Sequence, residues 1–515
     1  MRPIKNFPAY LLWVVSATIW IALTAIMPDF LDNPVYGVRG ISTIVCYIGA
    51  ISVVSFFVLY IFGINKYIAA VFYPLYGILG AGVSYYRVAY RVTITPLIID
   101  CVLHTNTQEA MSVISWQMVV WIILNLCISI LFVLWRWQLQ TPKYAYVHVA
   151  VALLLLIGYY HVNSRLHQSI NQRYPMHIVE SLRMYRVLQH DYQQERTTPI
   201  YTCNTVPIDS LDIVVIIGES MRADHLQLNG YHRETNPLLS QRNNIVSYPH
   251  IHSLYTHTLA SVPVILTRSD SLHPEYQYSE TSFATIFRKQ GFHTAWISNQ
   301  DMGETFAHFP AECDIALWVN VGKSTFVFSG WYDEELLPFV DKQMALNHPR
   351  NVFILHTIGS HWYYNNHVPD THNYFRPITN DRVVTNNTLE QVINSYDNTA
   401  RYMDFVVDSV IQRLENRCAI VFYLSDHGES LGENGYWLHA AGAEETKNPA
   451  CIVWYSDKYA QMFPHKIDAL YQNRTHRYLT DFLYHSVLSA ADIYIQQDTI
   501  DISKDIFTTS ISTTK

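Results

Sequence analysis

Long apolar runs in the first third of the chain constrain its fold more than any other feature. About 20 apolar residues in a helix cross the hydrocarbon core of a bilayer. Five segments have this character and are predicted as membrane helices: Ala9–Phe30, Ile41–Ile64, Tyr67–Tyr86, Trp116–Trp135 and Ala145–Val162. The first lacks a small-residue cleavage site, so we expect a retained anchor rather than a removed signal peptide. Residues 1–162 are therefore predicted to be a transmembrane domain.

Basic residues in the short loops predict the orientation of these helices. With a cytoplasmic amino terminus, five basic residues lie inside and three outside: Arg2, Lys5, Lys66, Arg136 and Lys143 against Arg39, Arg87 and Arg91. An odd number of helices then places everything after residue 162 outside the cytoplasm.

The overall composition excludes some classes of partner. Half of the residues are hydrophobic and only 15% are charged, and the formal net charge is -8 without any basic block. This charge distribution gives no support for nucleic-acid binding. The seven cysteines show no CxxC pair or regular spacing, so we expect free, buried thiols, with one disulfide as the alternative.

The pattern changes twice after the last apolar run. Residues 163–210 are polar, and the helical spacing of Ile178, Leu182, Tyr185 and Leu188 predicts a linker helix on the membrane surface. From residue 211 onward, continuous apolar runs predict strands covered on both faces. They are residues 212–217, 292–297, 351–355, 419–424 and 451–455. A helical pattern over Tyr396–Asn416 separates two of them, so residues 211–515 are predicted to form an α/β/α sandwich.

Polar side chains follow two of these strands directly. Glu219 comes after the first strand, and Asp426 and His427 come after the fourth. Open α/β sheets place ligand sites at the carboxyl ends of their strands, so these three side chains are candidate ligands for one zinc ion. The alternatives are a carboxylate at a helix N-terminus for Glu219 and a polar turn with an incidental histidine for the other two.

A segment rich in hydroxyls offers a candidate nucleophile. Pro263 suits the first turn of a helix, which would place Thr258 or Ser261 near the helix N-terminus. A hydroxyl bound to a dication ionises far below its solution pKa, although local sequence alone favours simple N-capping. His356 and His361 follow the third strand, and His439 lies a loop away from His427. Each is a ligand, a general acid or a core histidine.

Several short motifs occur along the chain in the same order as in a known enzyme family. They are Gly218-Glu219-Ser220, Thr258 with Ala260-Ser261-Val262-Pro263, Gly359-Ser360-His361, Tyr396-Asp397-Asn398 and Ser425-Asp426-His427-Gly428-Glu429 with His439. Arg222-Ala223-Asp224 and Thr235-Asn236-Pro237 agree as well. The chain resembles, over essentially its whole length, the phosphoethanolamine transferases of the alkaline phosphatase/sulfatase superfamily, the family of lipid A-modifying enzymes that includes those giving colistin (polymyxin) resistance.

The resemblance implies roles for individual residues. Thr258 would be the nucleophile, and Glu219, Thr258, Asp426 and His427 would hold a catalytic zinc. His361, His439 and Glu429 would bind substrate or a second zinc. Thr105 and Glu109 resemble the donor-pocket residues on the membrane side, although Cys101 stands where the family has an asparagine. Leu254 and Val264 replace a disulfide that brackets the nucleophile in the family, and the lysine expected after Ser298 is missing.

The resemblance implies an enzyme of the bacterial inner membrane with its catalytic domain in the periplasm. Its donor would be phosphatidylethanolamine, and its acceptor lipid A, the lipopolysaccharide core or another envelope glycan. The alternatives are a glycerol-phosphate transferase or membrane-tethered phosphatase of the same superfamily, or a membrane sensor or scaffold without activity. Bound zinc and the group carried by Thr258 separate these hypotheses.

Overall fold

The computed structural model describes most of the chain as two compact units. The first contains the described residues between 7 and 188, and the second those between 189 and 508. The described residues are 7–32, 37–90, 94, 98–99, 102–103, 114–162, 170–171, 173–192, 195–203, 209–300, 308–319, 330–381, 383–439, 442–496 and 504–508. Thr105 and Glu109, predicted for the donor pocket, lie outside them.

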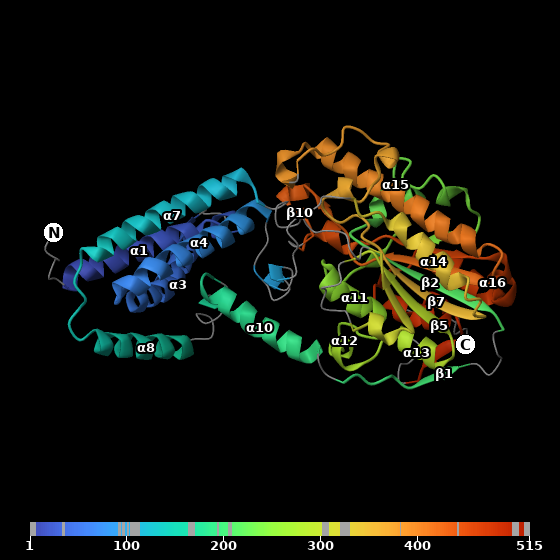
Figure 1. The fold of residues 1–515 in the computed structure, drawn as a ribbon, viewed down its shortest axis with the longest axis horizontal. Coiled ribbons are helices and arrows are strands. Elements are labelled where there is room, and N and C mark those ends of the chain that lie inside the picture. The colour runs from blue at the N-terminus through green and yellow to red at the C-terminus, as the bar shows by residue number, and fades with distance from the viewer. Residues whose placement is uncertain are drawn as a thin grey trace. The chain divides into compact units, whose positions relative to one another are not determined.

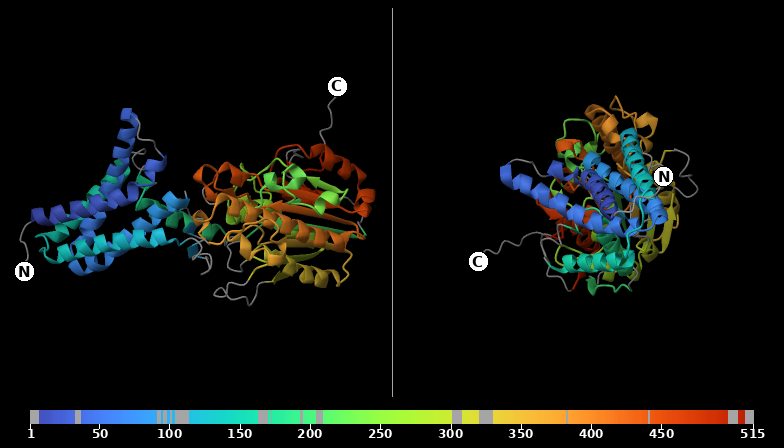
Figure 2. Two further views of the ribbon diagram at one scale, coloured as in Figure 1. Left: turned by 90° about the horizontal axis from the view of Figure 1, so that it is seen from above. Right: turned by 90° about the vertical axis from the view of Figure 1, so that its left-hand side faces the viewer.

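Four helices among the described residues are long and apolar enough to cross a membrane. They are α1 (Phe7–Ile26), α3 (Gly37–Gly63), α4 (Lys66–Tyr90) and α7 (Trp116–Trp137), in agreement with four predicted spans. Figures 1 and 2 show them within the first unit. The fifth predicted span forms α8 (Ala145–Val162), but its described apolar stretch, Ala145–Leu155, is shorter than the about 20 residues that a span needs. The count of five is therefore not confirmed.

Small residues and aromatic rings determine how these helices pack. The Trp13 ring of α1 stacks on the Tyr73 ring of α4, with centroids 4.9 Å apart. A Cβ atom on Gly77 would lie only 2.4 Å from the Trp20 ring, so glycine is required where α4 meets that indole. Buried Arg136 donates hydrogen bonds of 2.6 Å each to the carbonyls of Gly63 and Ile64 and so caps the end of α3.

Two further helices differ in character from the apolar ones. α2 (Asp29–Asp32) is a single turn after α1, and α10 (Met176–Tyr192) contains the four residues whose spacing predicted a linker helix. Charged side chains are spread along α10, among them Glu180, Arg183 and Arg186, whereas α1 contains no charged residue. The location of α10 on a membrane surface stays a prediction.

A seven-stranded sheet forms the centre of the second unit (Figure 1). Its order is β3-β11-β8-β2-β7-β5-β6. The strands are β3 (Ile245–Ser247), β11 (Cys451–Tyr455), β8 (Ala419–Ser425), β2 (Leu211–Gly218), β7 (Arg350–His356), β5 (His293–Ser298) and β6 (Ile315–Trp318). From β8 to β6 all neighbours are parallel, whereas β11 is antiparallel to both β8 and β3. All five predicted strands are confirmed, and the short edge strands β3 and β6 are additional.

Helices cover both faces of the sheet, as the sandwich prediction requires. Figure 1 shows α14 (Leu337–Met344) and α15 (Leu389–Leu414) on one side of β2, β7 and β5, and α11 (Thr258–Leu266) and α13 (Phe283–Lys289) on the other. α15 begins at Leu389, earlier than predicted, because Thr388 and Gln391 form a capping box there. Among the described residues of this unit, the α-helices after α11 also include α12 (Tyr276–Ser279), α16 (Asp457–Met462), α17 (Pro464–Asn473) and α18 (Phe482–Ser489).

Three small strand pairs complete the second unit. β1 (Tyr201–Cys203) pairs with β13 (Ile493–Ile495), β4 (Ile251–His252) with β12 (Tyr478–Leu479), and β9 (Ser430–Leu431) with β10 (Trp437–Leu438). The six described cysteines are free thiols: Cys313, Cys418 and Cys451 are buried as expected, whereas Cys46, Cys127 and Cys203 are exposed.

Candidate active site

The register of the central strands brings their carboxyl ends together. Gly218 at the end of β2 lies opposite Ser425 of β8, and Ile217 lies opposite His356 of β7. The residues that follow each strand therefore enter one crevice. The loop after β7 approaches Glu219 so closely that a Cβ on Gly359 would lie 2.9 Å from the Glu219 backbone nitrogen and oxygen, at a φ of +48°.

The structure brings the predicted nucleophile against the predicted ligands. The Thr258 hydroxyl donates a 2.7 Å hydrogen bond to Glu219 Oε2 and lies 3.5 Å from His427 Nε2. His427 Nε2 is 3.4 Å from Glu219 Oε1 and 3.3 Å from Asp426 Oδ2. These four side chains come from positions 219, 258, 426 and 427 and nonetheless share one centre.

Thr258 occupies the first position of α11, after His257 as N-cap. The Thr258 hydroxyl donates to Glu219 and does not cap the helix, and the side chain of the N-cap residue His257 makes no capping hydrogen bond either. Ser261, the other candidate, is directed to the Tyr255 carbonyl at 3.4 Å. The placement of Pro263 in the first turn was wrong, because α11 begins five residues before it.

Backbone contacts orient His427 and Asp426 toward the same centre. His427 Nδ1 lies 2.8 Å from the Gly428 carbonyl, which only accepts hydrogen bonds, so Nδ1 carries the proton and the Nε2 lone pair faces Glu219. Asp426 Oδ1 accepts from the backbone N–H groups of Ser220 at 3.2 Å and His427 at 2.8 Å. The Asp426 Oδ2 atom is buried and has no hydrogen-bond partner among the described residues.

The β9–β10 hairpin returns the chain to this centre. Leu438 pairs with Ser430, so the next residue, His439, comes back beside the start of the hairpin. Single donor atoms of Glu219, His427 and His439 all lie within 4.8 Å of one another. His439 Nδ1 is also 3.4 Å from Glu429 Oε1. The Glu429 oxygens are buried and make no hydrogen bond to any residue that the structure describes.

The two other predicted histidines occupy different places. The His361 ring lies 6.2 Å from the His439 ring, centroid to centroid, and its Nδ1 is 2.7 Å from the Trp362 carbonyl. His361 thus borders the centre on the side of His439. His356 is buried in β7, where its ring meets the edge of the Trp296 ring, so it is a core histidine.

Burial and charge perturb the titration of these groups. Burial raises the pKa of Asp426, and the neighbouring Glu219 carboxylate raises it further. Burial also acts to raise the pKa of Glu219, but the His427, His361 and His439 rings outweigh it and hold that pKa below its usual range. Burial raises the pKa of Glu429 to about 8 and lowers the pKa of His439 to about 3. Crowded, buried carboxylates of this kind are stabilised by a cation.

The residues present fit a zinc ion. Carboxylate oxygens and imidazole nitrogens are ligands that zinc prefers, and several of them converge here from rigid strand ends. The unsatisfied Asp426 and Glu429 oxygens are buried acceptors that a cation would satisfy. The donor set therefore matches the zinc site expected from the resemblance.

Three residues at the site were not predicted. Gln300 Nε2 donates to Glu219 Oε2 at 3.3 Å and to the Thr357 carbonyl at 2.9 Å. His257 precedes Thr258, and the His367 ring lies 6.2 Å from the His361 ring. The available signal for Gln300 was its position two residues after the buried strand β5, similar to the signal that identified Glu219.

Known proteins resemble both parts of the chain. The sequence model of the Sulfatase family matches residues 212–493, and that of the family Phosphoethanolamine transferase EptA/EptB matches residues 51–173. Phosphoethanolamine transferase EptA of Escherichia coli K12 is 32% identical over 297 residues, covering 54% of this chain and 53% of the relative. Kdo(2)-lipid A phosphoethanolamine 7''-transferase of Salmonella typhimurium is 30% identical over 316 residues, covering 57% and 55%. The chain thus spans about half the length of these curated relatives.

Solved structures extend the likeness to the whole fold. The integral membrane lipooligosaccharide phosphoethanolamine transferase A of Neisseria meningitidis superposes with a TM-score of 0.79 at 23% identity, over 98% of both chains. The periplasmic domain of Escherichia coli EptC, solved in complex with Zn, superposes with a TM-score of 0.54 at 22% identity, over 61% of this chain and 90% of that one. With the sulfatase match covering more than half of its residues, the chain belongs to the sulfatase family, and it joins the sulfatase fold to an amino-terminal region of the EptA/EptB type.

Proposed function

We propose that the protein transfers phosphoethanolamine from phosphatidylethanolamine to a glycolipid of the cell envelope, with lipid A or the lipopolysaccharide core as acceptor. One observation carries the proposal: the Thr258 hydroxyl donates to Glu219 Oε2 at 2.7 Å within the cluster formed by Asp426 and His427. The relatives are named for phosphoethanolamine transfer, and one of them for lipid A, which supports the reaction class and the acceptor. The apolar helices support lipid substrates and a place in the bacterial inner membrane, with the second unit in the periplasm.

The first step forms a covalent intermediate on Thr258. Thr258 Oγ1 attacks the phosphorus of phosphatidylethanolamine, the bond from phosphorus to the diacylglycerol oxygen breaks, and diacylglycerol leaves after gaining a proton. Glu219 Oε2 is placed to receive the hydroxyl proton, because it already accepts that hydrogen bond. Phosphoethanolamine then remains esterified to the threonine.

The second step regenerates the threonine. An oxygen of the acceptor attacks the same phosphorus, the bond to Thr258 Oγ1 breaks, and the threonine takes up the proton that the acceptor gives up. His361, His439 and Glu429 border the centre from the side of the β9–β10 hairpin, and we assign them to binding the transferred group or a second metal ion. Their two rings can donate to phosphoryl oxygens, and the Glu429 carboxylate can accept from an ammonium group.

Zinc completes this arrangement. Glu219, Thr258, Asp426 and His427 would hold one zinc ion, which when bound lowers the pKa of a hydroxyl and neutralises charge on phosphoryl oxygens. The zinc bound by the periplasmic domain of Escherichia coli EptC supports this choice of metal.

Mass spectrometry of the full chain purified from a Gram-negative host tests the proposal. We expect a fraction of the peptide containing Thr258 to carry phosphoethanolamine, and the Thr258→Ala protein to carry none and to leave lipid A unmodified. Thr256→Ala is the matched control, since the Thr256 hydroxyl contacts His257 Nδ1 at 3.3 Å instead of Glu219. Glycerol phosphate on the same peptide would identify the alternative transferase. Phosphoethanolamine turnover by a verified Thr258→Ala protein would refute the nucleophile.

A further inference from the structure

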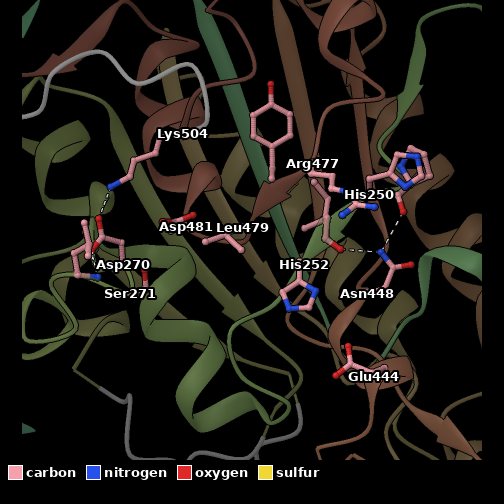
Figure 3. A pocket seen from close by; sticks show the side chains of 14 residues that line it. His250, His252, Asp270, Ser271, Glu444, Asn448, Arg477, Leu479, Asp481 and Lys504 are labelled. Carbon is pink, nitrogen blue, oxygen red and sulfur yellow. Dashed lines mark hydrogen bonds and ion pairs between the residues drawn. The ribbon is translucent and has the colours of Figure 1, made fainter.

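A second polar pocket lies in the second unit, apart from the residues of the proposed active site (Figure 3). Its volume of about 860 Å³ is within the range that accommodates small ligands. The wall comes from five parts of the chain: the segment around β4, the residues after α11, the segment before β11 with Glu444 and Asn448, the segment around β12, and Lys504. None of Glu219, Thr258, Asp426, His427, Glu429 and His439 lines it.

Strand pairing fixes the residues of this wall. In the parallel pair β4–β12, Tyr478 lies opposite Ile251 and Leu479 opposite His252. The Asn448 amide donates to the carbonyls of Pro249 at 3.1 Å and Ile251 at 2.7 Å, which holds the segment that carries both histidines of the pocket. The wall is therefore preorganised rather than formed by free loops.

Most charged groups of the pocket already have a partner. Asp270 Oδ1 accepts from the backbone N–H groups of Leu272 and His273, at 2.8 and 2.7 Å, and Asp270 Oδ2 binds Lys504. Glu444 pairs with Lys447 at 2.7 Å. Because these ion pairs neutralise their charges, Asp270 and Glu444 need no charged ligand of their own.

Asp481 is the exception on the acidic side. It is only 3% exposed and lines the pocket. Burial raises the pKa of Asp481 to about 6, although Lys504 and the backbone N–H groups of Asp481 and Phe482 act to lower it. The Lys504 ammonium already binds Asp270. Two carboxylates, Asp270 and Asp481, therefore share one ammonium at this end of the pocket, and a bound cationic N–H donor would balance the remaining negative charge.

Arg477 is the corresponding exception on the basic side. It is exposed and forms no ion pair with any described residue, and His250 and His252 line the same part of the pocket. Figure 3 shows Asp270 and Asp481 toward one end of the pocket and Arg477, His250 and His252 toward the other. Arg477 and Asp481 are four residues apart, which in extended chain separates their Cα atoms by about 13 Å. A ligand for both must therefore carry opposite charges at two ends.

We propose that this pocket binds a zwitterionic headgroup in which a phosphate is joined through a short linker to a primary ammonium. The guanidinium of Arg477 and the imidazoles of His250 and His252 match the phosphate, because charge-assisted donors favour its oxygens. The Asp481 carboxylate matches the ammonium and its N–H donors. The choice of phosphoethanolamine among such zwitterions rests on the proposed function. That the ligand carries a negative and a positive group follows from the charged residues of the pocket alone.

Titration calorimetry with the full chain in detergent micelles tests this site. The probes are sn-glycero-3-phosphoethanolamine, sn-glycerol 3-phosphate without an ammonium, and sn-glycero-3-phosphocholine, whose ammonium has no N–H. We expect the first to bind about tenfold or more tightly than the other two, the scale of one buried charged hydrogen bond. O-phosphoethanolamine, used as a fourth probe, separates a preference for the free phosphomonoester from one for the lipid headgroup.

Variants assign the two ends of the ligand. Asp481→Asn should reduce binding of sn-glycero-3-phosphoethanolamine to the level of sn-glycerol 3-phosphate, and Arg477→Gln should weaken both by a similar factor. The exposed Asp468 and Arg474 do not line the pocket, so Asp468→Asn and Arg474→Gln should bind as the unaltered protein does. If Asp481→Asn does not fold, the probe series and Arg477→Gln still decide the question.

A further arm separates this site from the proposed active site. Thr258→Ala should keep the full affinity of the pocket even where it carries no phosphoethanolamine on its nucleophile. A flat probe series, unchanged binding in Asp481→Asn, or loss of binding in Thr258→Ala would each overturn the proposal. Absence of a covalent adduct in the unaltered protein, with the probe series intact, would instead count against the proposed function alone.

Discussion

Replacing Gln300 by methionine tests a hydrogen bond that supports the proposed zinc ligand Glu219. The amide of Gln300 donates to Glu219 Oε2 at 3.3 Å and to the Thr357 carbonyl at 2.9 Å, and methionine of similar length removes both bonds. Losing an outer hydrogen bond to a metal ligand costs about 10- to 100-fold in metal affinity. Because 3.3 Å is a long hydrogen bond, we expect the lower end, about tenfold or about 1.4 kcal/mol.

Chelator competition with the purified full chain measures this effect directly. Zinc affinity should fall about tenfold in Gln300→Met, and the metal-free protein should lose about 1 kcal/mol of stability with the Thr357 bond. Gln343→Met is the matched control, because Gln343 is an equally buried amide of α14 that contacts His293 at 3.1 Å instead of a proposed ligand. Equal zinc affinities in the two variants would refute a role of Gln300 in positioning Glu219.

Two further predictions concern packing and pH. In Gly77→Ala the new methyl would lie 2.4 Å from the buried Trp20 ring, so overpacking should cost about 1–3 kcal/mol and lower the melting temperature in detergent. Gly82→Ala in the same helix meets nothing within 4 Å and should leave it unchanged or raise it; equal melting temperatures for the two would contradict the packing argument. Burial raises the pKa of Asp404 to about 7 against the backbone N–H bonds from Leu238 and Leu239. The folded protein then binds more protons than the unfolded one, so this contribution to stability is present below about pH 4 and lost as pH rises toward 7. Asp404→Asn should flatten the slope of unfolding free energy over that window, measured by urea unfolding at a series of pH values, and an unchanged slope would exclude this carboxyl as its source.

The sequence allowed prediction of the parts of the fold that are locally periodic and long. The runs that became β2, β7 and β8 contain four to six consecutive apolar residues, which is typical of short strands covered on both faces. The polar residues directly after them, Glu219 and Asp426, were therefore recognisable as candidates for a shared crevice. The edge strand β3 was not, because three residues give no measurable period.

The remaining parts of the site depend on contacts between distant segments. Gln300 reaches Glu219 because Ser298 of β5 pairs with His356 of β7, and sequence alone does not give that strand order. An amide is also an uncommon zinc ligand, so its chemistry gave no reason to single it out. The second pocket was hidden for the same reason, since β4 and β12 are two residues each and more than 200 positions apart.

Buried polar side chains, rather than the apolar strands, fix the geometry of the crevice. An apolar run is compatible with several registers, and a slip by one residue turns every side chain to the opposite face. Hydrogen bonds of three side chains that are not proposed zinc ligands oppose such a slip in register. The Ser425 hydroxyl accepts from the Met221 N–H at 2.8 Å, the Tyr396 hydroxyl bridges the Ser220 carbonyl and the Arg222 N–H, and Asp333 accepts from the N–H groups of Ile358 and Gly359.

Each of these groups would be costly to bury without its partner, so only the arrangement that satisfies all of them is stable. That arrangement is also the one in which Glu219 meets Thr258 and His427. The Tyr396-Asp397-Asn398 motif of α15 thus acts on the crevice from a distance: Tyr396 holds the backbone on both sides of Met221, and Asp397 binds His225, Tyr231 and Arg233 in the segment that follows. The motifs that carried the resemblance therefore include residues with a structural role. Tyr396 and Asp397 fix the segment that follows Glu219, as the sheet fixes the strand that precedes it.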